Sequence, residues 1–170
     1  HRQVAFLGIG FETTAPATAA AVQRAHALGL ANFTVLCNLV RVVPPLLALL
    51  DDPEVALDGL ISPGHVSTIL GCRPYEQISE RFTIPVVVAG FEPLDLLAAT
   101  VAVVSQVVDG RAEVENGYRR AVTWEGNAPA QALLAETFEV RDTFEWRGGR
   151  GAPRPPHPPA RPRSAPPAPL

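Results

Sequence analysis

Lysine and methionine are absent from these 170 residues, and only two cysteines are present. Two cysteines can form neither a disulfide framework nor a metal site built from cysteines alone. No apolar run is long enough to span a bilayer, and no charged segment followed by an apolar one marks a leader. The chain opens on His1 and enters an apolar run at Val4, so we expect it to be cut from something longer. These absences predict a soluble, cytoplasmic protein without a membrane partner.

Acidic residues are missing from one end of the chain. Residues 148–170 contain four arginines and no acid, for a net charge of +4, whereas residues 1–147 carry a net charge of −7. Binding to nucleic acid needs a basic face on the folded part of a protein, because that face must neutralise phosphates. The acidic body therefore predicts no nucleic-acid partner.

Residues 148–170 also have almost nothing to bury. They hold 9 of the 18 prolines, and their apolar side chains are alanines and a single leucine. Ordering such a segment would cost chain entropy without a gain from burial, so we expect a disordered, polyproline-like tail. The run at 155–159 could bind an aromatic-lined groove, but we interpret the tail as non-functional sequence.

The remaining residues, 1–147, form a hydrophobic body that suffices for one α/β domain. Apolar runs predict strands at 4–9, 33–37, 57–61, 85–89 and 138–146. Helices are predicted at 16–28, 44–50, 65–70, 75–82, 93–109 and 128–136. This alternation is typical of a Rossmann-like parallel sheet with flanking helices.

The segment 85–89 is the clearest strand, because it is apolar and β-branched on both faces, as in a parallel sheet covered by helices. The helix after it has a proline at its first position, Pro93, and Gly110 at its end. Its apolar residues recur at spacings of three and four, which predicts one apolar face; they are Leu94, Leu97, Val101, Val104 and Val108.

Polar residues or turn formers follow four of the predicted strands. The carboxyl ends of parallel strands meet at one edge of the sheet, where open α/β sheets bind ligands. We therefore expect a site built from these turns. Its candidate residues are Gly10, Phe11, Glu12, Thr13, Thr14, Pro63, Gly64, His65, Ser67 and Glu92.

The first of these turns begins like a dinucleotide-binding fingerprint, but Thr13 stands at the third glycine position, which disfavours nicotinamide binding. Thr14 instead predicts a capped helix start. One hypothesis is a small-molecule- or nucleotide-binding α/β enzyme in which Glu12, His65 and Glu92 are general acid–base groups. The competing interpretation is structural, with a plain helix cap and a histidine that only packs.

Two further features have structural interpretations. Cys37 and Cys72 fall in different turns, and we interpret them as small buried hydrophobic residues. The segment 113–120 combines acids and arginines around a tight-turn signal at Asn116-Gly117. We expect arginine–carboxylate pairing there rather than chemistry.

Five motifs in register carry a resemblance to a known family: Gly10-Phe11-Glu12-Thr13-Thr14, Pro63-Gly64-His65-Val66-Ser67, Ala89-Gly90-Phe91-Glu92-Pro93-Leu94-Asp95, Glu113-Val114-Glu115-Asn116 and Phe144-Glu145-Trp146-Arg147-Gly148. Together they resemble the HypD family of [NiFe]-hydrogenase maturation factors. The resemblance covers residues 3–148 almost continuously and in the family's order.

The resemblance implies a cytoplasmic scaffold that works with the chaperone HypC to assemble the Fe(CN)2CO unit, with cyanide delivered by HypE and HypF. It also implies two Rossmann-like domains and a C-terminal domain with a [4Fe-4S] cluster. Residues 1–147 would be the second α/β domain. By motif match, Glu12, Thr13, Thr14 and His65 would face the cleft where the iron unit is built.

The chain departs from the family in its cysteines. The cysteine motifs that relatives use for iron and thiol chemistry lie outside this sequence, so we expect this chain alone to bind no metal or cluster. We therefore expect a scaffold fragment that is not competent by itself, rather than an independent enzyme. The abrupt change after Arg147 suggests that residues 148–170 are a frameshifted or mis-assembled reading frame. Cysteine-containing HypD-like sequence in another frame of the encoding DNA would test that hypothesis.

Overall fold

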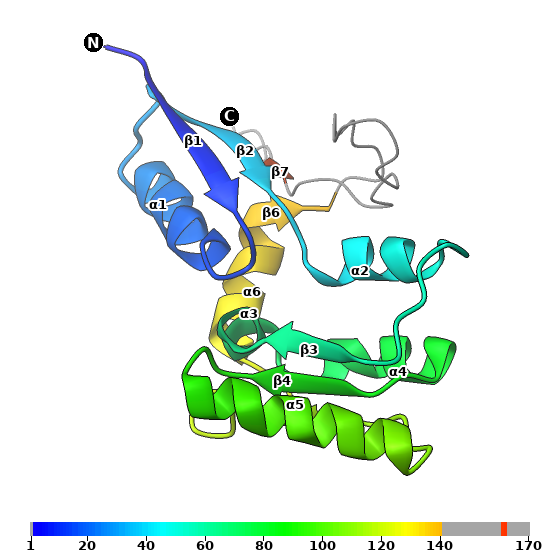
Figure 1. Ribbon diagram of the computed structural model, residues 1–170. Helices are drawn as coiled ribbons and strands as arrows, with labels where there is room; N and C mark the ends of the chain where they lie inside the picture. The colour runs from blue at the N-terminus through cyan, green and yellow to red at the C-terminus, as the bar shows by residue number, and fades with distance from the viewer. Residues whose placement is uncertain (1, 141–160, 163–170) are drawn as a thin grey trace.

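A computed structural model describes residues 2–140 and 161–162 of the chain (Figure 1). Helices and strands alternate along most of it, as an α/β protein requires. The elements are β1 (Val4–Gly10), α1 (Ala15–Ala27), β2 (Phe33–Leu39), α2 (Val43–Leu50), β3 (Leu60–Pro63), α3 (Gly64–Leu70), the 3-10 turn η1 (Arg73–Tyr75), α4 (Glu76–Phe82), β4 (Val86–Ala89), α5 (Pro93–Val108), β5 (Val114–Asn116), α6 (Ala128–Thr137), β6 (Phe138–Glu139) and β7 (Arg161–Pro162).

Strands β3, β4 and β5 form one parallel sheet with β4 in the middle. All four residues of β4 are buried, and they alternate between two cores. Val86 and Val88 pack on the side of α2 and α4, whereas Val87 and Ala89 pack on the side of α5. The prediction of a central strand covered on both faces is confirmed, and Figure 1 shows α5 on one side and α4 on the other.

Strands β1 and β2 form a second parallel sheet, in which Leu7 pairs with Leu36. One face of this sheet packs against α1 and α6 through a small core that includes Ala19, Leu39 and Phe138. No described helix or strand covers the opposite face, and Leu36 is 68% exposed. Among the described residues, this sheet is therefore covered on one side only.

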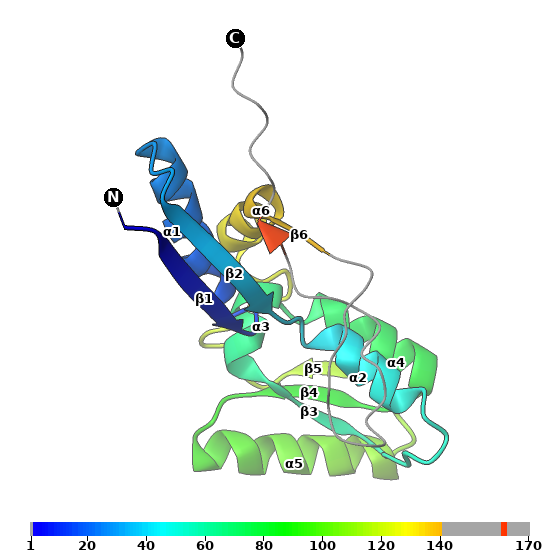
Figure 2. The same ribbon diagram turned by 90° about the horizontal axis from the view of Figure 1, so that it is seen from above.

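The prediction of an α/β fold with parallel strands and flanking helices is confirmed, but the strands belong to two sheets rather than one. Both sheets send their carboxyl ends toward α3, as Figures 1 and 2 show. The turns expected along a single edge are thus divided between two edges that meet near this helix. Strand length and sequence do not specify which strands pair, because pairing depends on tertiary packing.

Helix α5 lies on its sheet in an unexpected rotation. The residues that pack on the sheet are mostly small or polar, namely Ala99, Ala102 and Gln106, with Val103 beside them, and Ala99 and Gln106 are buried. The apolar stripe predicted from the three-and-four spacing points outward. Its members are all exposed: Leu94, Leu97, Val101, Val104 and Val108.

Several element boundaries also differ from the prediction. β3 begins at Leu60 rather than at residue 57, and the charged segment 113–120 contains β5, which was not expected. Of the strand predicted at 138–146, the structure has Phe138–Glu139 as β6, and the residues from 141 on lie outside the described part of the chain. β6 pairs with β7, so the tail contributes one short strand where disorder was expected. The other predictions for residues 148–170 fall outside the described part of the chain.

Within the described residues, no helix is long and apolar enough to cross a membrane.

Candidate functional site

The turn after β1 bends sharply into α1. Gly10 has a φ of 146°, and a Cβ on it would lie 2.5 Å from Thr14 Oγ1, so only glycine fits there. The Phe11 carbonyl then accepts hydrogen bonds from the N–H groups of Thr14 and Ala15. The turn therefore leaves the Phe11 ring, half exposed, at the carboxyl end of β1.

Glu12 points inward from this turn instead of into solvent. Its side chain is buried, and its Oε1 accepts a 2.9 Å hydrogen bond from the Val42 N–H, just before α2. Oε2 has no hydrogen-bond partner within the described residues. Burial raises the pKa of this carboxyl, while the Val42 hydrogen bond and the nearby Arg41 act in the opposite direction. Glu12 thus ties the first turn to the start of α2.

Thr13 and Thr14 are exposed on the same turn. Thr14 is the N-cap residue of α1, but its side chain makes no capping hydrogen bond, so the predicted hydroxyl cap is wrong. Its φ and ψ are helical, and an N-cap side chain normally reaches the helix N–H groups from an extended backbone. The two hydroxyls stay in solvent, where they are able to bind another molecule.

The turn after β3 depends on close packing. Gly64 opens α3, and a Cβ there would lie 2.3 Å from the Ala89 carbonyl oxygen of β4. Pro63 precedes it as the N-cap, and its carbonyl accepts a 2.9 Å hydrogen bond from Ser67 Oγ. Because the Ser67 proton is used there, Tyr75 Oη donates to Ser67 Oγ at 3.1 Å. Ser67 is fully buried and acts inside the fold, holding the start of α3.

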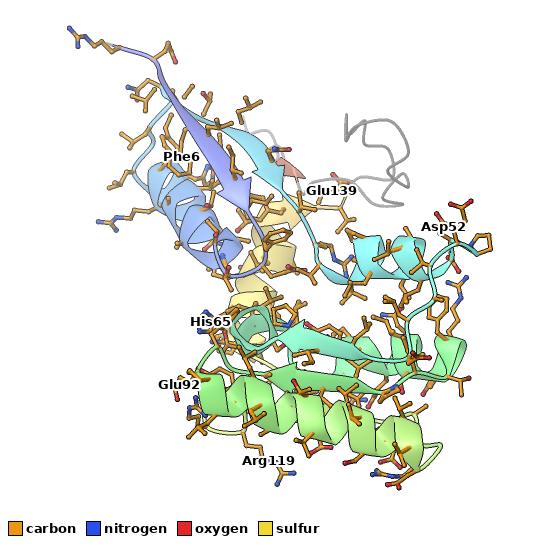
Figure 3. The ribbon with its side chains drawn as sticks, in the orientation of Figure 1. Phe6, Asp52, His65, Glu92, Arg119 and Glu139 are labelled. Atoms are coloured by element: carbon orange, nitrogen blue, oxygen red, sulfur yellow. The ribbon has the colours of Figure 1, made fainter. Side chains whose placement is uncertain are left out.

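His65 stands on the surface at the start of α3. Its ring packs on Phe91, with ring centroids 4.5 Å apart, and lies 6.3 Å from the ring of Tyr118. These three residues come from the turns after β3, β4 and β5. The sheet thereby gathers an aromatic cluster at its carboxyl end, and Figure 3 shows His65 on the same side as Glu92.

Arg120 borders this cluster and organises its charges. The guanidinium lies over the Tyr118 ring at 4.5 Å, forms a hydrogen bond of 2.8 Å to Asp95 and makes an ion pair of 3.2 Å with Glu92. Its hydrogen bonds lower the pKa of the Asp95 carboxyl. The expectation of arginine–carboxylate pairing in the segment 113–120 is confirmed, although both partners come from the start of α5.

A pocket of about 290 Å³ lies at the carboxyl end of the β1–β2 sheet. Most of its lining is apolar, with Arg41 and Gln131 among the polar exceptions. The lining residues are Phe11, Glu12, Ala15, Leu39, Val40, Arg41, Leu70, Gln131, Leu134, Ala135, Phe138 and Val140. The side chain of Gln131 is held by the carbonyls of Ile69 and Glu125, so it helps to join α6 to the end of α3.

The acid–base interpretation finds little support in this geometry. Glu12 accepts from a backbone N–H, Glu92 pairs with Arg120, and His65 packs on an aromatic ring. Among the described residues, no hydrogen bond or ion pair joins these three side chains to one another. The arrangement suits binding and positioning better than proton transfer.

The cysteines of the chain also show whether it could hold the iron–sulfur cluster that the resemblance implies. A [4Fe-4S] cluster is held by cysteine thiolates, and the chain has only Cys37, on β2, and Cys72, before η1. Burial raises the pKa of both thiols, that of Cys72 to about 11. These residues do not fit a cluster. Within residues 2–140 and 161–162, no three His, Cys, Asp or Glu side chains form a group able to hold a metal ion.

The sequence did not single out Tyr118, Asp95 or Arg120 as members of the candidate site. Asn116 is the residue from which the position of Tyr118 could have been predicted. Its Oδ1 accepts a hydrogen bond from the Tyr118 N–H, and its Nδ2 donates one to the Val122 carbonyl. An Asn-Gly pair that ends a strand makes such a turn, and the turn carries Tyr118 to the sheet edge. The pairing of Arg120 with α5 depends on the fold and has no local signal.

Known proteins are similar in sequence to most of this chain. The sequence model of HypD, described as "Hydrogenase formation hypA family", matches residues 1–153. Hydrogenase maturation factor HypD of Rhodobacter capsulatus is 52% identical over 147 residues, which cover 86% of this chain and 39% of that protein. HypD of Rhizobium leguminosarum bv. viciae is 53% identical over 153 residues, with 86% and 40% covered. HypD of Escherichia coli is 45% identical over 147 residues, with 86% and 39% covered.

The chain therefore spans about two fifths of the length of these curated relatives. The match of the family model to most of the sequence confirms the resemblance seen in the five motifs. This chain belongs to the HypD family of hydrogenase maturation factors.

Proposed function

We propose that this chain supplies an α/β part of a cytoplasmic scaffold on which, together with a HypC-like chaperone, the Fe(CN)2CO unit of [NiFe] hydrogenase is assembled. A HypE-like protein would donate the cyanide. The observation that carries the proposal is the placement of the family motifs. Three motifs that are far apart in the sequence, at 10–14, 63–67 and 89–95, form turns at the carboxyl ends of the two sheets, close to α3.

Within this scaffold, the exposed residues of the turns are the ones that would meet the iron unit or a partner. Thr13 and Thr14 present free hydroxyl groups, which are able to donate hydrogen bonds to the nitrogen ends of bound cyanide. His65 presents a ring that is already oriented by Phe91. The iron unit is cargo in this proposal, so these residues bind and orient it and do not supply its ligands.

Buried members of the same motifs would position the exposed ones. Glu12 fixes the first turn through Val42, and Ser67 fixes the start of α3 through Pro63 and Tyr75. The turn after β1 therefore contains both a buried carboxylate, which positions the turn, and two exposed hydroxyls, which would contact the cargo. Because the family's cysteine motifs lie outside this sequence, the chain would act as one part of a larger scaffold and would not assemble the iron unit alone.

The proposal is tested by exchanging segments in a full-length relative. Residues 3–140 of this chain replace the matching segment of Escherichia coli HypD, and the chimera is expressed in a strain that lacks HypD. We expect hydrogenase activity to return. A chimera that accumulates to the normal level and leaves activity at background would overturn the proposal.

A pair of variants of the chimera then tests the exposed hydroxyls. The double change Thr13→Val and Thr14→Val should lower hydrogenase activity by about tenfold or more, since one lost charge-assisted hydrogen bond already costs about 1.5 kcal/mol. Thr34→Val removes a hydroxyl of β2 that donates to the Val4 carbonyl and serves as the matched control. Full activity of the double variant would contradict the role of these hydroxyls.

A further inference from the structure

Two buried oxygen atoms, Glu12 Oε2 and Ser62 Oγ, have no hydrogen-bond partner in the part of the chain that the structure describes. Both residues are more than nine-tenths buried, with exposed fractions of 6% for Glu12 and 3% for Ser62. A polar atom in the interior without a partner is unfavourable, because it has given up its hydrogen bonds to solvent. The surroundings of the two atoms show which partner would satisfy them.

The side chain of Ser62 faces the main core. Ser62 lies on β3 two residues after Leu60, so the two side chains are on the same face of the strand. Leu60 packs against the core cluster that contains Val43 and Tyr75. The Ser62 hydroxyl is therefore on the Tyr75 side of the β3–β4–β5 sheet.

The Glu12 carboxylate reaches the same core from the other sheet. Its Oε1 accepts the hydrogen bond from the Val42 N–H, and the next residue, Val43, belongs to the core cluster with Tyr75. Glu12 comes from the turn after β1, at the place where the carboxyl ends of the two sheets approach each other near α3 (Figure 1). The two oxygen atoms thus belong to different sheets and share one neighbourhood.

The ionisation of Tyr75 responds to both side chains. Burial raises the pKa of the phenol and the negative charge of Glu12 raises it further, whereas the hydroxyls of Ser67 and Ser62 lower it. These influences agree with the packing, which brings Glu12 and Ser62 toward the phenol oxygen from opposite sheets.

The hydrogen bonds of the phenol define which groups remain to be satisfied. Ser67 Oγ donates to the Pro63 carbonyl, so Tyr75 Oη donates to Ser67 Oγ and can still accept a hydrogen bond itself. The remaining groups are two acceptors, Glu12 Oε2 and Tyr75 Oη, and one donor, the Ser62 hydroxyl. A water molecule complements this set, because it donates two hydrogen bonds and accepts at least one, and buried waters typically make about three.

We propose that Glu12 Oε2, Ser62 Oγ and Tyr75 Oη form a binding site for one internal water molecule, which joins the turn after β1 to β3. The water donates to Glu12 and Tyr75 and accepts from Ser62, so each of the three atoms has a partner. The site holds the turn that carries Thr13 and Thr14 against the β3–β4–β5 sheet. It requires neither the iron unit nor a maturation partner, and it stands whether or not the proposed function holds.

A high-resolution crystal structure of the full 170-residue chain tests the site directly. We expect an electron-density peak within about 3.2 Å of all three oxygen atoms, which is the range of a hydrogen bond. A direct hydrogen bond between the Glu12 and Ser62 side chains, or no density between them, would overturn the proposal. A peak surrounded by six or more oxygen atoms would overturn it as well, because that coordination marks a metal cation.

A double-mutant cycle tests the same site in solution. Glu12→Gln keeps a carbonyl oxygen for the Val42 N–H and replaces the acceptor at Oε2 with a donor, and Ser62→Ala removes the donor on the other side of the water. The two changes are made singly and together, and urea denaturation gives the equilibrium constant of unfolding. Because both side chains bind one water, the effect of the double variant should differ from the product of the single effects by about fivefold.

Glu12→Gln combined with Ser79→Ala is the matched control. Ser79 is as buried as Ser62, but its hydroxyl donates to the Ala112 carbonyl beside α4. The effects of this pair should multiply to within about twofold, as expected for independent sites. If the effects of Glu12→Gln and Ser62→Ala multiply equally well, the two side chains share no water and the proposal is wrong.

Discussion

The two sheets of this protein are built from similar strands but are covered differently. In the β3–β4–β5 sheet, Val86, Val87 and Val88 are 0–1% exposed, because helices lie on both faces. In the β1–β2 sheet, Leu7 and Leu36 stand opposite each other on a face that nothing described in the structure covers. An apolar strand sequence therefore does not tell by itself whether the strand is enclosed.

The two sheets also contribute differently to the core and to the candidate site. The enclosed sheet supplies the principal core and holds the His65 cluster at its carboxyl end, while the open sheet ends in the turn that presents Thr13 and Thr14. The curated relatives are about two and a half times as long as the segment that matches this chain. A face left bare in this chain is thus compatible with a family whose members have more polypeptide.

The largest expected effect compares one aspartate in each sheet. Val87→Asp places a carboxylate in the enclosed sheet and should lower the free energy of unfolding by about 4 kcal/mol or more, because the charge has no partner there. Leu36→Asp places the same group on the bare face and should cost less than about 1 kcal/mol. Urea denaturation measures both, and equal losses would mean that the bare face is covered in solution.

A smaller effect is expected inside the core of the enclosed sheet. Tyr75→Phe removes a buried hydroxyl that donates to Ser67, and it should lower the free energy of unfolding by about 1 kcal/mol. Tyr118→Phe, at the partly exposed end of the same sheet, is the matched control and should change stability by less than about 0.5 kcal/mol. The two variants are compared by thermal and urea unfolding, and a larger loss for Tyr118→Phe would contradict the assigned contacts.

β4 and the helix that follows it show how far the sequence alone was informative. β4 was predictable as a strand, because its residues are apolar and mostly β-branched, and α5 was predictable at both ends from Pro93 and Gly110. The orientation of α5 was not, because the helix is apolar on both faces and its sheet-facing residues, which include Ala99, Ala102 and Val103, are no larger than those on its outer face. Which apolar face is buried depends on the space left by β4.

For the candidate site, the positions of most turns were predictable from the sequence, but the orientations of their side chains were not. The turns after β1, β3 and β4 could be predicted from glycine, proline and threonine, and the structure places them at strand ends. The turn predicted after residue 37 is wrong, because Cys37 and Asn38 lie within β2, which continues to Leu39.

The inward orientation of Glu12 and Ser67 could not be predicted, because a polar residue in a turn normally faces water and is buried only when the fold provides a partner. Val42 and Tyr75 are those partners, and both are distant in the sequence.

A pH titration examines the turn at the end of the open sheet. Burial raises the pKa of Glu12 above its ordinary value of 4.5, so the unfolded chain loses this proton at a lower pH than the folded one. The contribution of Glu12 to stability therefore falls as the pH rises from 4.5 through the raised pKa, and it does not change below that range.

Glu12→Gln removes this titration while it keeps an acceptor for the Val42 N–H. The melting temperature of the variant, relative to the wild-type chain, should increase steadily from mildly acidic to neutral pH. Glu54→Gln makes the same substitution at an exposed position and serves as the matched control. A constant difference for Glu12→Gln would show that the carboxyl is not buried in solution.

The smallest effect concerns the two thiols, one in each region. Cys37 is partly exposed on β2, whereas Cys72 is fully buried beside the enclosed sheet with a pKa of about 11. Since the thiolate is the reactive form, iodoacetamide should modify Cys37 first, and Cys72 should react mainly after unfolding. Mass spectrometry of peptides after timed alkylation measures the order, and faster modification of Cys72 would place it outside the core.

Hydrogen exchange of the full chain tests the difference between the sheets most directly. Amides of β4 should exchange slowest, at the rate of global unfolding, and those of β1 should exchange at least about tenfold faster, because a sheet covered on one face opens locally. Slow and equal exchange in both sheets would contradict this account, since it would require a cover on the outer face of β1 and β2.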